Sequence, residues 1–103
     1  MLQDVNKKYV FENIENKKGV YLLVFHALWC GPCRMFKESL TELNEKEGIE
    51  VLRVNIDEEQ ELASEFKVKS IPTWFIFKDG KIVEKAMGYL TYPELKKKVS
   101  KYL

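Results

Sequence analysis

Residues 20–33 read VYLLVFHALWCGPC, an almost uninterrupted apolar run that leads directly into two closely spaced cysteines. Such a run, rich in valine and aromatic residues, is typical of a central strand that is covered on both faces. From Cys33 onward, apolar residues recur at helical spacing until Gly48 supplies a C-terminal stop. The cysteines are therefore predicted to lie at the turn between the middle strand of a sheet and a helix.

The flanking segments predict more helices and strands. Apolar residues at helical spacing indicate a first helix over residues 5–14, which ends before Gly19. Alternating residues 49–56 indicate a strand. Asp57, with Gln60 three positions later, resembles the N-terminal cap of a short helix.

The last third of the chain carries the clearest turn and cap signals. Asp79-Gly80 separates two β-like runs, residues 74–77 and 82–83, and this pattern predicts an antiparallel hairpin. Thr91 and Glu94 then form the pattern of a capping box for a last helix. The element order predicts an α/β fold, a three-layer sandwich in which helices flank a central mixed β-sheet. At 103 residues, the chain is expected to be a single domain over residues 1–103.

Composition limits the classes of function. Seventeen basic and sixteen acidic side chains give a net charge of +1, which provides no long-range field to attract nucleic acid or anionic lipid. The basic run Lys96-Lys97-Lys98 is interpreted as a solvated helix face. We therefore expect a monomer that binds neither nucleic acid nor membranes.

No segment predicts a membrane span or export. The apolar run that begins at Val20 is about half of the roughly 20 residues that a spanning helix needs. The N-terminus has no apolar stretch and cleavage site of the signal-peptide kind. Two cysteines in such a chain indicate the reducing cytoplasm, where a pair is more often catalytic or metal-binding than a structural staple.

The position of the cysteines indicates redox chemistry. Cys30 falls at or just before a predicted helix N-terminus, where unpaired N–H groups and the helix dipole favour a thiolate. The thiolate is the nucleophile in disulfide exchange, so Cys30 is expected to attack a disulfide. Cys33, one helical turn further on, is placed to resolve the mixed disulfide that results.

A zinc site and an inert buried pair are the two alternatives to redox chemistry for these cysteines. Zinc needs about four ligands, usually cysteine or histidine, and only His26 remains as a third, so no metal site is expected within one chain. An inert buried pair is disfavoured because Gly31 and Pro32 hold the cysteines on an exposed turn.

Several motifs together resemble one known family. The run Trp29-Cys30-Gly31-Pro32-Cys33 closely resembles the active-site signature of thioredoxins, and later landmarks match in order and spacing: Ser70-Ile71-Pro72-Thr73, Phe77-Lys78-Asp79-Gly80 and Met87-Gly88. The resemblance covers roughly residues 20–100 and implies the thioredoxin fold and reduction of protein disulfides. It implies no bound cofactor beyond a redox-active Cys30–Cys33 disulfide. Electrons would come from NADPH through thioredoxin reductase, and the other partners would be disulfide-containing client proteins.

The resemblance also implies site residues. In thioredoxins the proline that matches Pro72 is cis, faces the cysteines and lets the preceding backbone pair with an extended substrate. The residues expected to rim an apolar substrate groove are Trp29, Gly31, Pro32, Ile56, Ile71, Met87 and Gly88. For Trp29, Ile56 and Met87, ordinary packing is the alternative role.

The sequence departs from the family at two positions of the buried strand. Most thioredoxins have a buried aspartate where this chain has Val24, and Arg53, which matches its basic neighbour, therefore lacks that partner. His26 replaces a tryptophan, and it is expected either to fill the packing site, with a hydrogen bond to Asp57, or to transfer protons. Apart from these departures, the sequence predicts a protein-disulfide reductase. The alternative is a binding module of the same fold whose cysteines are incidental.

Overall fold

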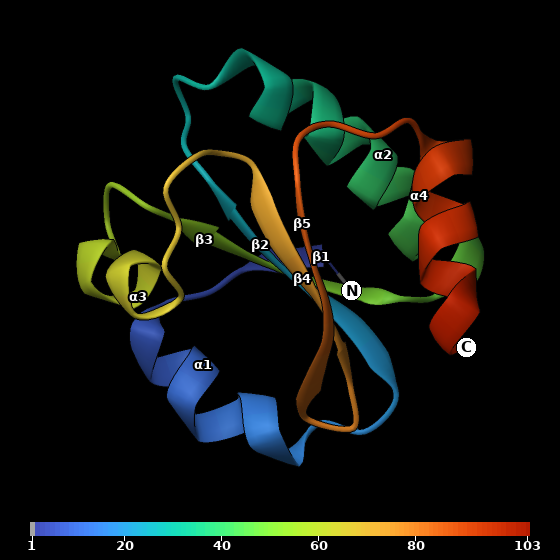
Figure 1. The fold of residues 1–103 in the computed structure, drawn as a ribbon, viewed down its shortest axis with the longest axis horizontal. Coiled ribbons are helices and arrows are strands. Elements are labelled where there is room, and N and C mark those ends of the chain that lie inside the picture. Colours follow the sequence, from blue (N-terminus) through green and yellow to red (C-terminus); the bar gives the residue numbers. More distant parts are fainter. Residues whose placement is uncertain (1) are drawn as a thin grey trace.

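The computed structural model describes residues 2–103, which form a five-stranded mixed sheet between two layers of helices (Figure 1). The strand order is β1-β3-β2-β4-β5. The bounds are β1 (Leu2–Asp4), β2 (Val20–His26), β3 (Glu50–Asn55), β4 (Thr73–Lys78) and β5 (Lys81–Met87). Strands β1, β3 and β2 are mutually parallel, whereas β4 pairs antiparallel with both β2 and β5. The prediction that the apolar run forms the middle strand is confirmed.

Four α-helices cover the two faces of the sheet. Figure 1 shows α1 (Lys7–Asn13) and α3 (Gln60–Glu65) on one side, and α2 (Gly31–Glu47) and α4 (Tyr92–Val99) on the other. Short 3-10 turns follow α1 at Ile14–Asn16 and α4 at Ser100–Tyr102. The predicted three-layer α/β sandwich is therefore confirmed. None of the helices within residues 2–103 has the length and apolar character to cross a membrane.

Strand β2 contributes side chains to both halves of the core. Leu23 and Phe25 lie in the cluster that packs against α1 and α3, while Leu22 and Val24 lie in the cluster that packs against α2 and α4. All four are at most 1% exposed. Alternate side chains of a strand point to opposite faces, so a strand between two helical layers is apolar at nearly every position.

The N-terminal segment differs from the prediction. Leu2–Asp4 pairs with β3, and the first helix begins only at Lys7, where Asn6 accepts a hydrogen bond from the Tyr9 N–H at 2.9 Å. The expected start at Val5 is wrong, because the Val5 N–H donates to the Arg53 carbonyl at 2.8 Å and extends the strand pairing. A three-residue strand leaves no periodicity to detect.

The predicted helix caps are confirmed at one helix and wrong at another. Thr91 and Glu94 form both hydrogen bonds of the capping box of α4. Helix α3 starts at Gln60, so Asp57 lies too far before it to serve as a cap, and no side chain caps that helix. The Asp57 carboxylate instead accepts a hydrogen bond from Trp29.

The predicted hairpin joins β4 to β5 through a two-residue turn. Asp79 has φ of 51° and Gly80 has φ of 83°, the left-handed pair typical of a type I′ turn. The turn is also tied to the rest of the fold, since the Gly19 N–H donates to the Asp79 carboxylate at 2.8 Å. A Cβ built on Gly80 would collide with the backbone of Glu15.

Replacing Gly80 with alanine is therefore expected to lower the free energy of unfolding by about 1–3 kcal/mol, because both the backbone conformation and the space require glycine. The matched control is Gly48→Ala. Gly48 has φ of 69°, but no heavy atom lies within 4 Å of a Cβ built there. Urea denaturation of both variants checks the prediction, and equal losses would show that the contact with Glu15 does not matter.

Candidate active site

The two cysteines lie at the start of α2, just after the short connection from β2, and they form a disulfide. Cys30 is the capping residue of α2, and its Sγ accepts a hydrogen bond from the Cys33 N–H at 3.2 Å. Pro32 lies in the first turn, where its missing N–H costs no helical hydrogen bond. The expected position of Cys30 at the helix N-terminus is confirmed. The N–H groups of this turn can stabilise negative charge on its sulfur.

The loop before β4 approaches the cysteines through Ile71, the residue before Pro72. The Ile71–Pro72 peptide bond is cis, as the family resemblance implies, and Pro72 is buried. Its carbonyl accepts a hydrogen bond from the Gly88 N–H at 2.9 Å. The Ile71 carbonyl oxygen lies 3.9 Å from the Sγ of Cys30. Ile71 therefore lies beside the disulfide.

Trp29 and Asp57 interact across the site. Trp29 is 65% exposed, which excludes the alternative of a core aromatic, and its indole N–H donates to the Asp57 carboxylate at 2.9 Å. The expected hydrogen bond from His26 to Asp57 is wrong, because the Nδ1 of His26 binds Arg53 on β3 and its Nε2 has no hydrogen-bond partner within residues 2–103. The Trp29–Asp57 pair holds a large apolar ring open to solvent beside Cys30.

Most of the expected groove residues come together around the cysteines. Ile56 and Ile71 pack on the cluster of Ala27, Cys30 and Cys33. A pocket of about 210 Å³ is lined by Trp29, Ile56, Ala63, Val68, Lys69, Ser70 and Ile71. Met87 is 66% exposed, and its sulfur accepts a hydrogen bond from the Ser70 hydroxyl at 3.5 Å. Met87 therefore also lies on this side of the site. Neither Gly31 nor Pro32 of the active-site turn is buried, and Gly88 is held to Pro72.

His26 and Arg53 form a buried pair on the α2 side of the sheet. A guanidinium N–H of Arg53 (Nη2) donates to the Nδ1 of His26 at 2.9 Å, and Nη1 of Arg53 lies 3.6 Å from the Asp4 carboxylate. Arg53 lacks the aspartate that Val24 replaces, as expected, and it contacts His26 and Asp4 instead. The Nδ1 lone pair of His26 is used by Arg53, so neutral His26 carries its proton on Nε2. This arrangement leaves His26 no free lone pair with which to accept a proton from Cys33.

The same pair should make stability depend on pH. Burial, and then the charge of Arg53, lowers the pKa of His26 to about 4 from 6.5. Below pH 6.5, His26 gains a proton in the unfolded chain but stays neutral in the folded protein. Its contribution to the free energy of unfolding is therefore complete only above pH 6.5. It is lost as the pH falls toward 4, and the loss amounts to about 3 kcal/mol.

Urea denaturation of the wild type and of His26→Phe between pH 7 and about pH 4 tests this loss. The lowered pKa values of Glu47 and Glu84, both hydrogen-bonded to tyrosine and lysine side chains, reduce acid stability in the two proteins alike. The difference between the proteins therefore isolates His26. Parallel pH profiles would contradict the prediction.

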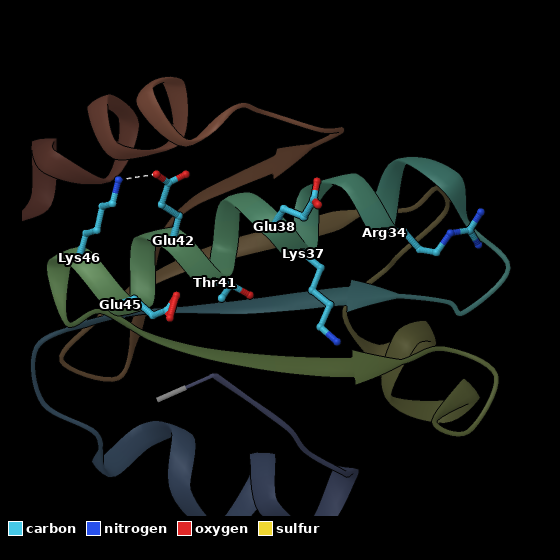
Figure 2. A pocket seen from close by; sticks show the side chains of 7 residues that line it. All are labelled: Arg34, Lys37, Glu38, Thr41, Glu42, Glu45 and Lys46. Carbon is cyan, nitrogen blue, oxygen red and sulfur yellow. Dashed lines mark hydrogen bonds and ion pairs between the residues drawn. The ribbon is translucent and has the colours of Figure 1, made fainter.

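The structure adds residues near the site that the sequence analysis did not identify. Arg34 donates to the Leu28 carbonyl at 2.9 Å, and Leu28 is 72% exposed beside Trp29. Leu28 belongs to the apolar run, so the sequence pattern suggests that it is buried. The only signal for its exposure is that it lies beyond His26, the last residue of β2. A larger hollow of about 540 Å³ follows the outer face of α2 (Figure 2). Its lining side chains all belong to that helix, and they include none of the groove residues.

Known proteins are similar to this chain in sequence and in fold. The family model described as Thioredoxin matches residues 2–101. The thioredoxin of Bacillus subtilis is 40% identical over 91 residues, which cover 86% of this chain and 88% of that protein. The thioredoxin of Listeria monocytogenes is 41% identical over 91 residues, which again cover 86% of this chain and 88% of that protein. A mutant thioredoxin from Halobacterium salinarum superposes with a TM-score of 0.89 at 32% identity, covering 98% of this chain and 89% of that one.

A disulfide at a helix N-terminus in this fold, together with these relatives, defines a thiol-disulfide oxidoreductase that acts as a protein-disulfide reductase. Its substrates are disulfide-containing proteins. The chain belongs to the thioredoxin family. Within residues 2–103, no group of three or more His, Cys, Asp or Glu side chains is arranged to hold a metal ion.

Proposed function

We propose that Cys30 is the attacking residue and Cys33 the resolving residue of this reductase. The Cys30 thiolate attacks one sulfur of a client disulfide, and the other client sulfur leaves as a thiolate that takes up a proton. The Cys33 thiolate then attacks the Sγ of Cys30 and releases the second client sulfur. The client gains two electrons and two protons, and the chain is left with the Cys30–Cys33 disulfide.

The observation that carries this assignment is the cap of α2. The Cys33 N–H donates to the Sγ of Cys30, so the helix N-terminus stabilises a thiolate at Cys30. Solvent exposure does not show which cysteine attacks, since Cys30 is 5% and Cys33 is 3% exposed in the disulfide form. The hydrogen bond and the position at the start of the helix distinguish them.

The client segment is proposed to lie in the groove. Its apolar side chains would contact Trp29, Ile56 and Met87, and its backbone would pair with Ile71 as an added strand. Gly31, Pro32, Pro72 and Gly88 would support this surface, and Asp57 would position Trp29. The proximity of Ile71 to the Cys30 sulfur supports this placement.

The proposal also covers how the disulfide is reduced again and in which compartment the protein acts. Thioredoxin reductase, with NADPH as the source of electrons, would reduce the Cys30–Cys33 disulfide after each cycle. A dithiol reductant persists where the thiol pool is reduced, so we place the protein in the cytoplasm. We expect one thioredoxin domain over residues 1–103 that acts as a monomer, and the family match over residues 2–101 supports the single domain.

Alkylation of the reduced protein near neutral pH tests the roles of the cysteines. Cys30 is expected to react with iodoacetamide well before Cys33, because a thiolate reacts and a thiol does not. Peptide mass spectrometry at short times gives the order. Modification of Cys33 first would overturn the assignment. In parallel, the wild type should catalyse reduction of insulin by dithiothreitol while Cys30→Ser does not, whereas equal rates would indicate a binding module.

A further inference from the structure

The His26–Arg53 pair leaves one buried hydrogen-bond donor unused. His26 is 4% exposed, and its Nδ1 accepts from Arg53, so the proton lies on Nε2. Nε2 is buried and has no hydrogen-bond partner among residues 2–103. The nearest carboxylate oxygen, Oδ1 of Asp4, is 3.9 Å away, beyond hydrogen-bond distance. A buried donor without a partner is destabilising, so an acceptor at this position would be stabilising.

His26 and Arg53 both line a pocket of about 320 Å³ whose charge is mainly positive. The pocket is lined by Asp4, His26, Ala27, Leu28, Arg34, Lys37 and Arg53. Three cationic side chains therefore face a single carboxylate, and the Asp4 side chain is 74% exposed to water. Figure 2 shows Lys37 extending from α2 on the side of the sheet, and its charge is felt at His26, where it lowers the pKa of the imidazole.

Two donors point toward the same small volume. The single oxygen Oδ1 of Asp4 lies 3.6 Å from Nη1 of Arg53 and 3.9 Å from Nε2 of His26. An acceptor oxygen somewhat nearer to both nitrogens than Oδ1 of Asp4 would accept from both at once. Hydrogen bonds between a guanidinium and an anionic oxygen are among the strongest in proteins, and two donors at fixed spacing select oxygen ligands.

We propose that this pocket is a binding site for a small oxyanion, either a phosphate or a carboxylate group. The group is held by Nε2 of His26 and the guanidinium of Arg53, with Lys37 and Arg34 supplying charge at the rim. Asp4 competes for the same donors. Ala27 lines the pocket and also packs against Cys30 and Cys33, so this residue lies between the pocket and the disulfide, and none of the groove residues lines the pocket.

His26 is the one histidine of the chain, so its ring resonances report on the pocket without ambiguity. Sodium phosphate is titrated into the full-length protein at neutral pH, with sodium chloride at equal ionic strength as the reference. We expect the His26 ring signals to shift saturably with sodium phosphate and not with sodium chloride. Bound phosphate should also raise the pKa of His26 above its value of about 4, because a neighbouring anion favours the imidazolium.

Variants separate a specific site from general salt effects. Lys37→Gln should weaken phosphate binding about two- to fivefold, and Asp4→Asn should tighten it by a similar factor. The matched control is Lys46→Gln, which removes a lysine from the same helix but outside this pocket. Equal weakening by Lys46→Gln, or no saturable shift with phosphate or with the acidic peptide below, would overturn the proposal.

A second titration identifies the source of the anion. A short cysteine-free peptide with one glutamate is compared with its glutamine counterpart, using the same His26 signals. A saturable shift with the glutamate peptide and not with the glutamine peptide assigns the pocket to acidic side chains of proteins. A shift with phosphate alone assigns it to free phosphate or phosphate esters. Neither readout depends on the cysteines, so the site can fail while the proposed redox roles stand.

Discussion

Replacing Cys33 with serine is expected to stop turnover and to trap the client. The variant keeps the Cys30 thiolate and its cap, so the first attack proceeds and forms a mixed disulfide. Serine cannot attack that disulfide, and dithiothreitol-driven insulin reduction should fall by at least about 10²-fold. Non-reducing electrophoresis should show a covalent adduct that disappears with excess reductant.

Cys30→Ser is the matched control for this variant. It should lose turnover equally but form no adduct, because the remaining sulfur lies one turn inside α2 and is not the sulfur that the Cys33 N–H stabilises at the start of the helix. If Cys33→Ser formed no adduct while Cys30→Ser did, the two roles would be reversed. The trapped adducts would also identify the clients.

Replacing Val24 with aspartate is expected to lower stability and to accelerate resolution of the mixed disulfide. Val24 is 1% exposed and packs in the cluster with Phe36 and Trp74. A carboxylate there loses hydration, so we expect a loss of roughly 2–4 kcal/mol in the free energy of unfolding. Its neighbour in the register of β3 is Arg53, which can offset part of that cost.

The kinetic effect of Val24→Asp follows from the missing base. In the family this carboxylate helps to deprotonate the resolving cysteine, and here His26 offers no lone pair in its place because Arg53 occupies Nδ1. Aspartate should therefore speed release of the mixed disulfide by up to about 10²-fold, with little change in the first attack by Cys30. Stopped-flow reduction of a fluorescent disulfide peptide separates the two steps.

Val24→Asn provides the control for the substitution. Asparagine has nearly the same shape and polarity but takes up no proton, so it should destabilise the fold without accelerating resolution. Equal resolution rates in Val24→Asp, Val24→Asn and the wild type would show that a missing base does not limit this protein. In that case, slower resolution in His26→Phe would assign the proton transfer to the histidine and would contradict the inference that Arg53 occupies its only lone pair.

Sequence alone was enough for the features that depend on neighbouring residues. The apolar run identified β2 as the middle strand, the Asp79-Gly80 pair identified the hairpin, and Thr91 with Glu94 identified the cap of α4. Each is decided by side-chain periodicity or by backbone conformations that few residues adopt. The Cys30–Cys33 spacing at a strand-to-helix turn belongs to the same class, because both sulfurs lie within one turn of chain.

Tertiary structure alone decided the contacts between residues far apart in the sequence. Strand β1 exists because residues 2–4 pair with β3, and Asp57 binds Trp29 instead of capping α3 or binding His26. The pairing of Arg53 with His26 likewise depends on the parallel alignment of β2 and β3. A buried polar group takes whichever partner the packed sheet brings within about 3 Å, and that choice leaves no periodic trace along the chain.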